Sequence, residues 1–421
     1  MSITVVIPTH NRVQLLDQTL SSLCVQTERA FRVVVVDHAS EDDIRGLCAR
    51  YQDRLALTYH WLAKEKDAPG LPRHAGMQLV ETPLAAFLDC GIVVPSFFIA
   101  SHLAFHQQHP HYVGVGLYHG YTPWRAQDER WPQALARMSI DEAMSVLDEQ
   151  PDMADERPET DLEHSHFAWA YGWTGNLSLR SDDYWSAGGF DLELEYALED
   201  LELAYRLFCQ GVKFGLVENG WAIHLPHSRP PARVLRRMKY LGCAHCYNKS
   251  RSLSWEVMLY TGVDLKSADE TYRYLSELGQ EMAAWPATAP FVSQHAFSRP
   301  SLLLGGTLQD AALYDYLALA DERIAASASL WSCCGPRIPL DDQTLQSVVV
   351  TEIWKYLNRA FNKSGVTLLE CMIIDLKRTA QRVFFLDRAE VCSEREHPCA
   401  LAELERLCQH YDLPFEVLTG A

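Results

Sequence analysis

Two acidic stretches about a hundred residues apart carry the strongest chemical signal in the sequence. The first is FLDCG at residues 87–91, where an apolar run brings Asp89 to the end of a predicted strand. The second is GGFD at 188–191 followed by LEDLE at 198–202, where acids open an amphipathic helix. An acid at a strand end can hold a nucleotide or a metal ion. An ionised acid in a first helical turn can take a proton from a hydroxyl group.

Strands and helices alternate in the pattern that leads to the first of these acids. Apolar runs predict strands, and helical periodicity predicts the helices between them. The predicted strands are 3–7, 31–36, 55–59 and 84–88, and the predicted helices are 13–25, 41–51 and 73–80. Such alternation is typical of a mostly parallel sheet, and its ligands bind beyond the carboxyl ends of the strands. Asn11, Asp37 and Asp89 all follow strand ends, so we expect them to meet there.

The rest of the chain predicts one insertion and one further domain. Residues 119–170 are rich in Trp, Pro and acids, and we expect an insertion or lid beside the site. Strands near 173–179, 213–217 and 221–225 and a helix at 198–210 complete an α/β domain at 1–230. Residues 231–421 are expected to form a mainly α-helical accessory domain. Its predicted helices are 233–248, 270–284, 309–327, 342–362 and 400–411.

Composition limits the partners and the compartment. Asp and Glu number 55 against 37 Lys and Arg, and the net charge of −18 argues against a nucleic-acid binder, which would need a basic footprint. An anionic nucleotide must then be met by a metal ion or by local cations. The sequence begins without a secretory signal, lacks an apolar run of bilayer length, and scatters its 12 cysteines without a framework. We expect a cytoplasmic protein.

Short motifs in this order resemble a known enzyme family. They are VVIPTHNR at 5–12, DHAS at 37–40, GLPRHAG at 70–76, Asp89, and the Glu199-Asp200 pair. Over roughly residues 1–228 the chain resembles the family 2 glycosyltransferases of GT-A fold, and it is also similar to galactosyltransferase-type C-terminal catalytic segments. The resemblance implies transfer of a hexosyl or N-acetylhexosaminyl group from a nucleotide-sugar, expected to be a UDP-sugar, to an acceptor hydroxyl. It also implies Mn²⁺ or Mg²⁺ as cofactor and inversion at the anomeric carbon.

The resemblance assigns expected roles residue by residue. Asp200 is the expected base, and Glu199 is expected to orient the acceptor. Asp89 and His224 are the expected metal ligands. The expected donor-binding residues are Pro8, Thr9, Asn11, Arg12, Asp37, Arg73 and Asp89. The expected acceptor-binding residues are Trp173, Gly189 and Asp191.

One departure from the family pattern keeps alternatives open. The family's Asp-x-Asp motif reads Asp-Cys-Gly here, so Gly91 stands where the second acid usually binds metal. A catalytically inert nucleotide- or glycan-binding module is therefore the rival interpretation. A nucleotidyltransferase is disfavoured, because no glycine-rich loop follows the first strand. The acceptor stays open among glycans, lipid-linked molecules, peptides and small molecules. Two further possibilities also stay open. One is peripheral membrane contact through residues 233–247, and the other is a homodimer through the second half of the chain.

Overall fold

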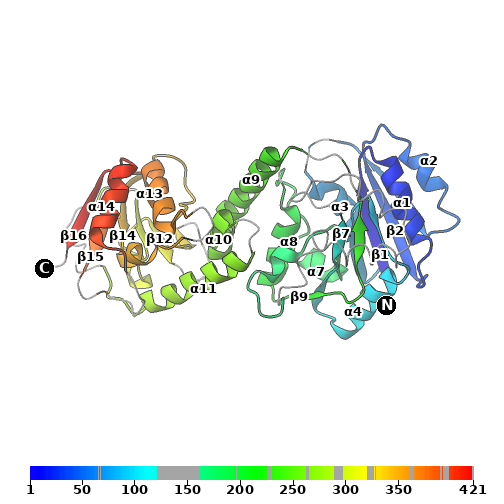
Figure 1. Cartoon of the computed structure of the whole chain (residues 1–421), viewed down its shortest axis with the longest axis horizontal. Helices are drawn as coiled ribbons and strands as arrows, with labels where there is room; N and C mark the ends of the chain where they lie inside the picture. The colour runs from blue at the N-terminus through cyan, green and yellow to red at the C-terminus, as the bar shows by residue number, and fades with distance from the viewer. Residues whose placement is uncertain are drawn as a thin grey trace. The chain divides into compact units, whose positions relative to one another are not determined.

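The computed structural model divides into two compact units, Met1–Gly242 and Cys243–Ala421 (Figure 1). We describe each unit by itself. The expected domain boundary near residue 230 stays a prediction. The structure describes residues 1–64, 66, 68–120, 162–195, 197–225, 227, 230–261, 265–288, 297–319, 327, 329–360, 365–388, 391 and 398–419.

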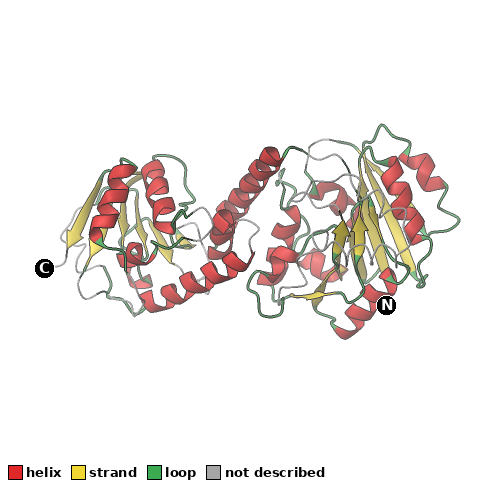
Figure 2. Ribbon diagram, in the orientation of Figure 1, coloured by secondary structure: helices red, strands yellow, loops and turns green. Residues whose placement is uncertain are grey.

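The first unit is built on a seven-stranded mixed sheet in the order β3-β2-β1-β4-β8-β6-β9 (Figure 2). Its first four strands run parallel, and β4–β8 and β8–β6 are antiparallel pairs. Mostly apolar, β-branched sequences such as ITVVIPT suit these buried strands. The strands are β1 (Ile3–Thr9), β2 (Phe31–His38), β3 (Leu57–Leu62), β4 (Leu84–Leu88), β6 (Tyr112–Val115), β8 (Asn176–Arg180) and β9 (Lys213–Leu216).

A second, three-stranded sheet carries His224 to the end of β4. It consists of β5 (Ile92–Val93), β10 (Ala222–His224) and β7 (Tyr118–Gly120), with β10 in the middle. His224 pairs with Ile92, and the N–H of Leu225 donates to the carbonyl oxygen of Gly91. Asp89 and His224 are therefore held close together, although 135 positions separate them in the sequence.

Helices cover both faces of the large sheet. The side chains of α1 and α2 join the main apolar cluster on one face, while Ala75 of α3 packs with Val34 and Val36 of β2 in a separate cluster. The helices are α1 (Val13–Leu23), α2 (Ile44–Ala49), α3 (Gly70–Met77), α4 (Phe98–Gln108), α7 (Ser181–Ser186), α8 (Glu199–Cys209) and α9 (Ala232–Ser250). The predicted α/β class and the mostly parallel sheet leading to Asp89 are confirmed.

The second unit corrects the expectation of a mainly helical domain. It contains a six-stranded, all-parallel sheet in the order β13-β12-β11-β14-β15-β16. The strands are β11 (Ser301–Leu304), β12 (Tyr316–Leu319), β13 (Leu330–Ser332), β14 (Leu345–Val350), β15 (Ala380–Asp387) and β16 (Phe415–Thr419). The helices are α10 (Leu253–Thr261), α11 (Leu265–Met282), α13 (Leu368–Thr379) and α14 (Leu401–His410), with 3₁₀ turns at Leu308–Asp310 and Glu352–Tyr356.

The helical expectation failed because buried parallel strands lack alternation. Residues 342–362 were expected to be one helix, but they contain β14, whose sequence LQSVVV is buried at five of its six positions. Likewise 309–327 contains β12. A strand that is buried on both faces of its sheet shows no alternation of apolar and polar residues. A short apolar run of this kind therefore cannot be assigned to a strand or a helix from its periodicity. The expected helices at 233–248, 270–284 and 400–411 do form, as α9, α11 and α14.

Two further sequence expectations concern the lid and the membrane. Most of the expected lid, residues 121–161, lies outside the described residues. Its described end forms a buried 3₁₀ turn, η3 (Ala168–Tyr171), that packs on α8. In the described part of the chain, no helix combines the length and the apolar character that crossing a membrane requires.

Candidate active site

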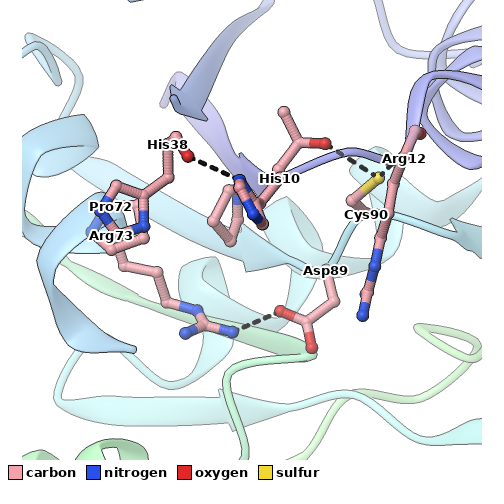
Figure 3. Close-up of a pocket in the computed structure, with 9 residues that line it drawn as sticks. His10, Arg12, His38, Pro72, Arg73, Asp89 and Cys90 are labelled. Carbon is pink, nitrogen blue, oxygen red and sulfur yellow. Dashed lines mark hydrogen bonds and ion pairs between the residues drawn. The ribbon is translucent and has the colours of Figure 1, made fainter. Parts of the chain in front are cut away.

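A polar cleft opens at the carboxyl ends of β1, β2 and β4, as the alternating pattern predicts. Its volume is about 220 Å³ (Figure 3). Five expected donor-binding residues line it: Pro8, Thr9, Arg12, Arg73 and Asp89. Four lining residues were not expected: His10, His38, Pro72 and Cys90. His10 follows β1 and His38 is the last residue of β2, so their positions alone could have indicated them.

Arg73 joins the two acidic stretches that the sequence separates. It projects from α3, and its Nη2 lies 2.5 Å from Asp89 Oδ1. Its Nη1 lies 3.1 Å from Glu199 Oε1, at the start of α8. The guanidinium is 11% exposed and Glu199 9% exposed, so water screens this pair weakly. The expected convergence of the two stretches is therefore present, with a buried cation between them.

Asp89 is the carboxylate that faces the cleft. Although burial acts to raise its pKa, the pKa of Asp89 is lowered overall by Arg73, with smaller contributions from His224 and Arg12. Figure 3 shows the guanidinium groups of Arg73 and Arg12 on opposite sides of Asp89. Asp89 therefore stays ionised, between two cations that an incoming diphosphate could also contact.

Glu199 and Asp200 hold protons more tightly than ordinary carboxyl groups. Burial, reinforced by the charge of Asp200, raises the pKa of Glu199 to about 7, with Arg73 opposing. Burial also raises the pKa of Asp200, against Arg73 and the backbone N–H groups of Leu201 and Thr174. The helix dipole alone led us to expect a fully ionised Asp200. Burial of two adjacent acids outweighs that effect.

The backbone before α8 is strained where it presents this pair. Leu198 precedes Glu199 with φ of +89°, in the left-handed region that bulky residues rarely adopt. Such outliers persist only where surrounding contacts enforce them, and they cluster at functional sites. One enforcing contact comes from α9, because a Cβ added at Gly242 would lie 2.2 Å from the carbonyl oxygen of Ala197. The start of α8 is thus fixed in place by close backbone packing.

The raised pKa values predict the pH dependence of activity. A general base works only when deprotonated, so kcat/KM should rise as pH rises through the apparent pKa of the Glu199–Asp200 pair. Because both pKa values are raised, that rise should centre above about pH 4, where an isolated carboxyl titrates. In Glu199→Gln the neighbouring charge is lost, and the rise should move to lower pH. A wild-type profile that rises near pH 4, or one unchanged in Glu199→Gln, would contradict this assignment.

The metal-binding expectation fits the described residues only in part. Among them, no group of three or more His, Cys, Asp or Glu side chains lies together as a metal site requires. Asp89 and the buried His224 offer one carboxylate and one imidazole. Gly91, at the position of the missing acid, has φ of +94°, which disfavours an aspartate there. A divalent ion would therefore need its remaining ligands from the donor diphosphate and water.

Two expected donor-binding residues do not line the cleft. Asp37 is 2% exposed, and its carboxylate accepts hydrogen bonds from Ser40 N at 2.9 Å and Tyr59 Oη at 2.8 Å. Asn11 takes a left-handed conformation, and its Oδ1 accepts a hydrogen bond from the N–H of Glu41 at 2.7 Å. Both side chains thus brace the loop after β2. Their direct contact with a donor stays a prediction.

Of the acceptor-binding expectations, Trp173 lies beside the acids. Its ring centroid is 6.0 Å from that of Tyr118, whose ring in turn is 5.8 Å from that of His224. The backbone N–H of Thr174, the next residue, acts to lower the pKa of Asp200. Tyr118 was missed by sequence reasoning, because it stands at the edge of the expected insertion without a motif around it.

Gly189 and Asp191 belong to a loop that is held in place rather than free. Arg206 Nη2 donates to the carbonyl oxygen of Gly189 at 2.6 Å and also pairs with Glu202. Glu202 is 6% exposed, so its ion pair with Arg206 is a largely buried clamp between α8 and the glycine loop. The acceptor-binding role of Gly189 and Asp191 stays a prediction.

Comparisons with known proteins show which proteins this chain is similar to. Residues 4–167 match the family described as glycosyl transferase family 2. The chain is 33% identical to validoxylamine A glucosyltransferase from Streptomyces hygroscopicus subsp. jinggangensis (strain 5008), over 83% of this chain and 90% of that protein. It is 26% identical to chondroitin synthase from Pasteurella multocida (strain Pm70), over 55% of this chain and 25% of that protein.

The similarity of this chain to solved structures is weaker than its similarity to the relatives above. S. aureus TarS 1–349 in complex with UDP-GlcNAc aligns with a TM-score of 0.43 and 18% identity, covering 68% of this chain and 82% of that chain. The overall likeness is therefore limited.

Proposed function

The chain belongs to glycosyl transferase family 2 and is a glycosyltransferase, and we propose that it moves a hexose from a UDP-sugar to an acceptor hydroxyl with inversion. One observation carries the proposal most: Arg73 holds Asp89 and Glu199 together, with Asp200 adjacent. This arrangement supports donor binding and proton removal at one place. The similarity to a protein named as a glucosyltransferase makes UDP-glucose the first donor to examine.

Each described residue has a distinct part in the proposed reaction. The acceptor oxygen attacks the anomeric carbon, its proton passes to the Asp200 carboxylate, and the bond from the sugar to UDP breaks. Arg73 and Arg12 face the negative charge that grows on the departing diphosphate. Glu199, which was expected to orient the acceptor, is a positioning residue in this proposal, since its carboxylate anchors Arg73 at 3.1 Å.

A divalent cation completes the proposed donor site. Asp89 and His224 would hold it, and it would supply further positive charge beside the diphosphate when bound. Manganese suits the mixed oxygen and imidazole donor set better than magnesium, which prefers oxygen alone. We also propose the cytoplasm as the compartment, because the cysteines among the described residues are free thiols.

Calorimetric titration with UDP, combined with a hydrolysis assay, distinguishes an active enzyme from an inert binding module. The protein should bind UDP, and Mn²⁺ should tighten binding in wild type but much less in His224→Ala. The same samples, given a panel of sugar nucleotides, should slowly hydrolyse one donor in preference. His410→Ala is the matched control, since His410 is exposed on α14 of the second unit. UDP binding with no hydrolysis of any donor would favour the inert binding module.

A further inference from the structure

The glycine loop, residues 188–191, contacts both helices that carry the candidate site. On one side it packs on α3, because a Cβ added at Gly70, the first residue of that helix, would lie 3.0 Å from Phe190 Cβ. On the other side it is tied to α8, because Arg206 Nη2 donates to the carbonyl oxygen of Gly189 at 2.6 Å. The loop therefore links the helix of the buried arginine to the helix of the two acids.

Tyr184 strengthens the contact with α3 through a chain of hydrogen bonds. The side chain of Tyr184 is 0% exposed, and its hydroxyl oxygen accepts the backbone N–H of Phe190 at 3.3 Å. The same hydroxyl lies 2.8 Å from His74 Nδ1 on α3. Because a buried hydroxyl hydrogen needs an acceptor, we assign it to the bond with His74 Nδ1. Burial lowers the pKa of His74, which keeps the imidazole neutral and able to accept.

Close packing makes the position of Arg73 sensitive to this contact. Gly189 has φ of +68°, and a Cβ added there would lie 2.8 Å from His74 Nδ1 and 3.0 Å from the Tyr184 hydroxyl. His74 directly follows Arg73 in α3, so a displacement of the helix at one residue moves the other. Arg73 Nη1 lies 3.1 Å from Glu199 Oε1, and lengthening this contact by about 0.5 Å would take it beyond hydrogen-bond range.

We propose that Tyr184 and His74 are positioning residues, whose hydrogen bond holds α3 against the glycine loop and thereby sets the distance from Arg73 to Glu199. The proposal rests on the proposed function, in which Arg73 and the two acids act at one site. Among the described residues that line the cleft, neither Tyr184 nor His74 is present. Their effect on the reaction is therefore exerted through Arg73.

The distance from Arg73 to Glu199 has a measurable signature in the titration of Glu199. Burial and the charge of Asp200 raise the pKa of Glu199 to about 7, Arg73 opposes them, and Asp89 adds a smaller upward effect. If Arg73 moves away from Glu199, its opposing effect weakens and the pKa of Glu199 should rise further. A substitution that only lowered the free energy of unfolding would leave the pKa of Glu199 in the folded protein as it is.

Titration of Glu199 by ¹³C NMR in the free protein measures this signature. Glutamate labelled at its side-chain carboxyl carbon gives the signal, and the signal that disappears in Glu199→Gln is that of Glu199. Tyr184→Phe keeps the ring but removes the hydroxyl, and it should raise the pKa of Glu199 by about 0.5 or more. His74→Leu should raise it similarly. His74→Asn, whose side-chain oxygen can still accept from Tyr184, should keep it within about 0.2 of wild type.

Tyr51→Phe is the matched control for the loss of a buried hydroxyl. Tyr51 is 6% exposed, and its hydroxyl lies 2.7 Å from Ser21 Oγ and donates to Asp17 Oδ1 at 2.7 Å. This change should keep the pKa of Glu199 within about 0.2 of wild type, because these partners belong to α1. An unaltered Glu199 pKa in Tyr184→Phe, or an equal rise in Tyr51→Phe, would overturn the proposal. So would equal rises in His74→Leu and His74→Asn.

The titration needs no turnover, so the positioning role and the proposed function are tested separately. A raised Glu199 pKa in Tyr184→Phe, in a protein that hydrolyses no sugar nucleotide, would support the positioning role and reject the proposed function. If the wild-type protein is active, the rise of kcat/KM with pH should move to higher pH in Tyr184→Phe and stay in place in Tyr51→Phe. An active enzyme whose Glu199 pKa is the same with and without the Tyr184 hydroxyl would reject the positioning role alone.

Discussion

Replacing Asp200 with Asn should lower kcat by about 10³-fold while UDP affinity stays within about twofold of wild type. The amide keeps the size of the side chain but cannot accept the acceptor proton. Asp200 does not line the cleft that we assign to the nucleotide, so donor binding should survive. Steady-state kinetics with the preferred donor, together with UDP titration, measure the two quantities separately.

The control for this prediction is Asp182→Asn. Asp182 lies on α7, is 84% exposed, and pairs with Arg180 at 3.3 Å. The same chemical change there should leave kcat within about twofold, because exposed ion pairs contribute little. If Asp200→Asn kept a tenth or more of the wild-type kcat, Asp200 would not be the base, and the assignment of α8 as the catalytic helix would need revision.

Replacing Arg73 with Met should damage both stability and donor binding. The change leaves Asp89 and Glu199 without their shared cation, and breaking a buried ion pair by removing one partner typically costs about 3–5 kcal/mol of unfolding free energy. Because Asp89 is about one-third exposed, we expect a loss of about 3 kcal/mol. UDP affinity should fall at least about tenfold, since a cation that lines the cleft is lost. Urea denaturation and UDP titration measure the two effects.

A double variant separates the structural from the functional part of this loss. Arg73→Met/Glu199→Gln removes the buried charge that the single change leaves unpaired, so it should recover part of the stability. It should not recover UDP affinity. Arg32→Met is the matched control, because the Arg32–Glu81 pair is exposed at 59% and 75% and should matter little. Recovery of UDP affinity together with stability would show that Arg73 only supports the fold.

The sequence predicted the elements of the site better than the contacts within it. Periodicity and strand-end position located β4, α8 and their acids, since each lies in a strongly patterned segment. The sequence did not reveal that Arg73 forms ion pairs with both Asp89 and Glu199. The pair with Glu199 joins residues 126 positions apart, and only the packing of α3 against the sheet brings them together.

One error and one unforeseen contact have physical causes that local patterns cannot show. The parallel sheet of the second unit was read as helices, because strands such as β11, SLLL, are buried at every position. Asp37 was assigned to the donor from its place at a strand end. The donor role stays a prediction, but the sequence did not reveal that the hydroxyl of Tyr59, on the neighbouring strand β3, donates a hydrogen bond to this carboxylate. Cross-strand partners depend on register, which single-sequence patterns leave undetermined.

A crystal structure of the protein with UDP, Mn²⁺ and an acceptor is the most direct test of whether donor and acceptor meet between Asp89 and Asp200. We predict the diphosphate in the cleft between Arg12, Arg73 and Asp89, and an acceptor hydroxyl within about 3 Å of the Asp200 carboxylate. UDP bound away from that cleft, or an Asp200 carboxylate that faces away from the acceptor, would contradict it.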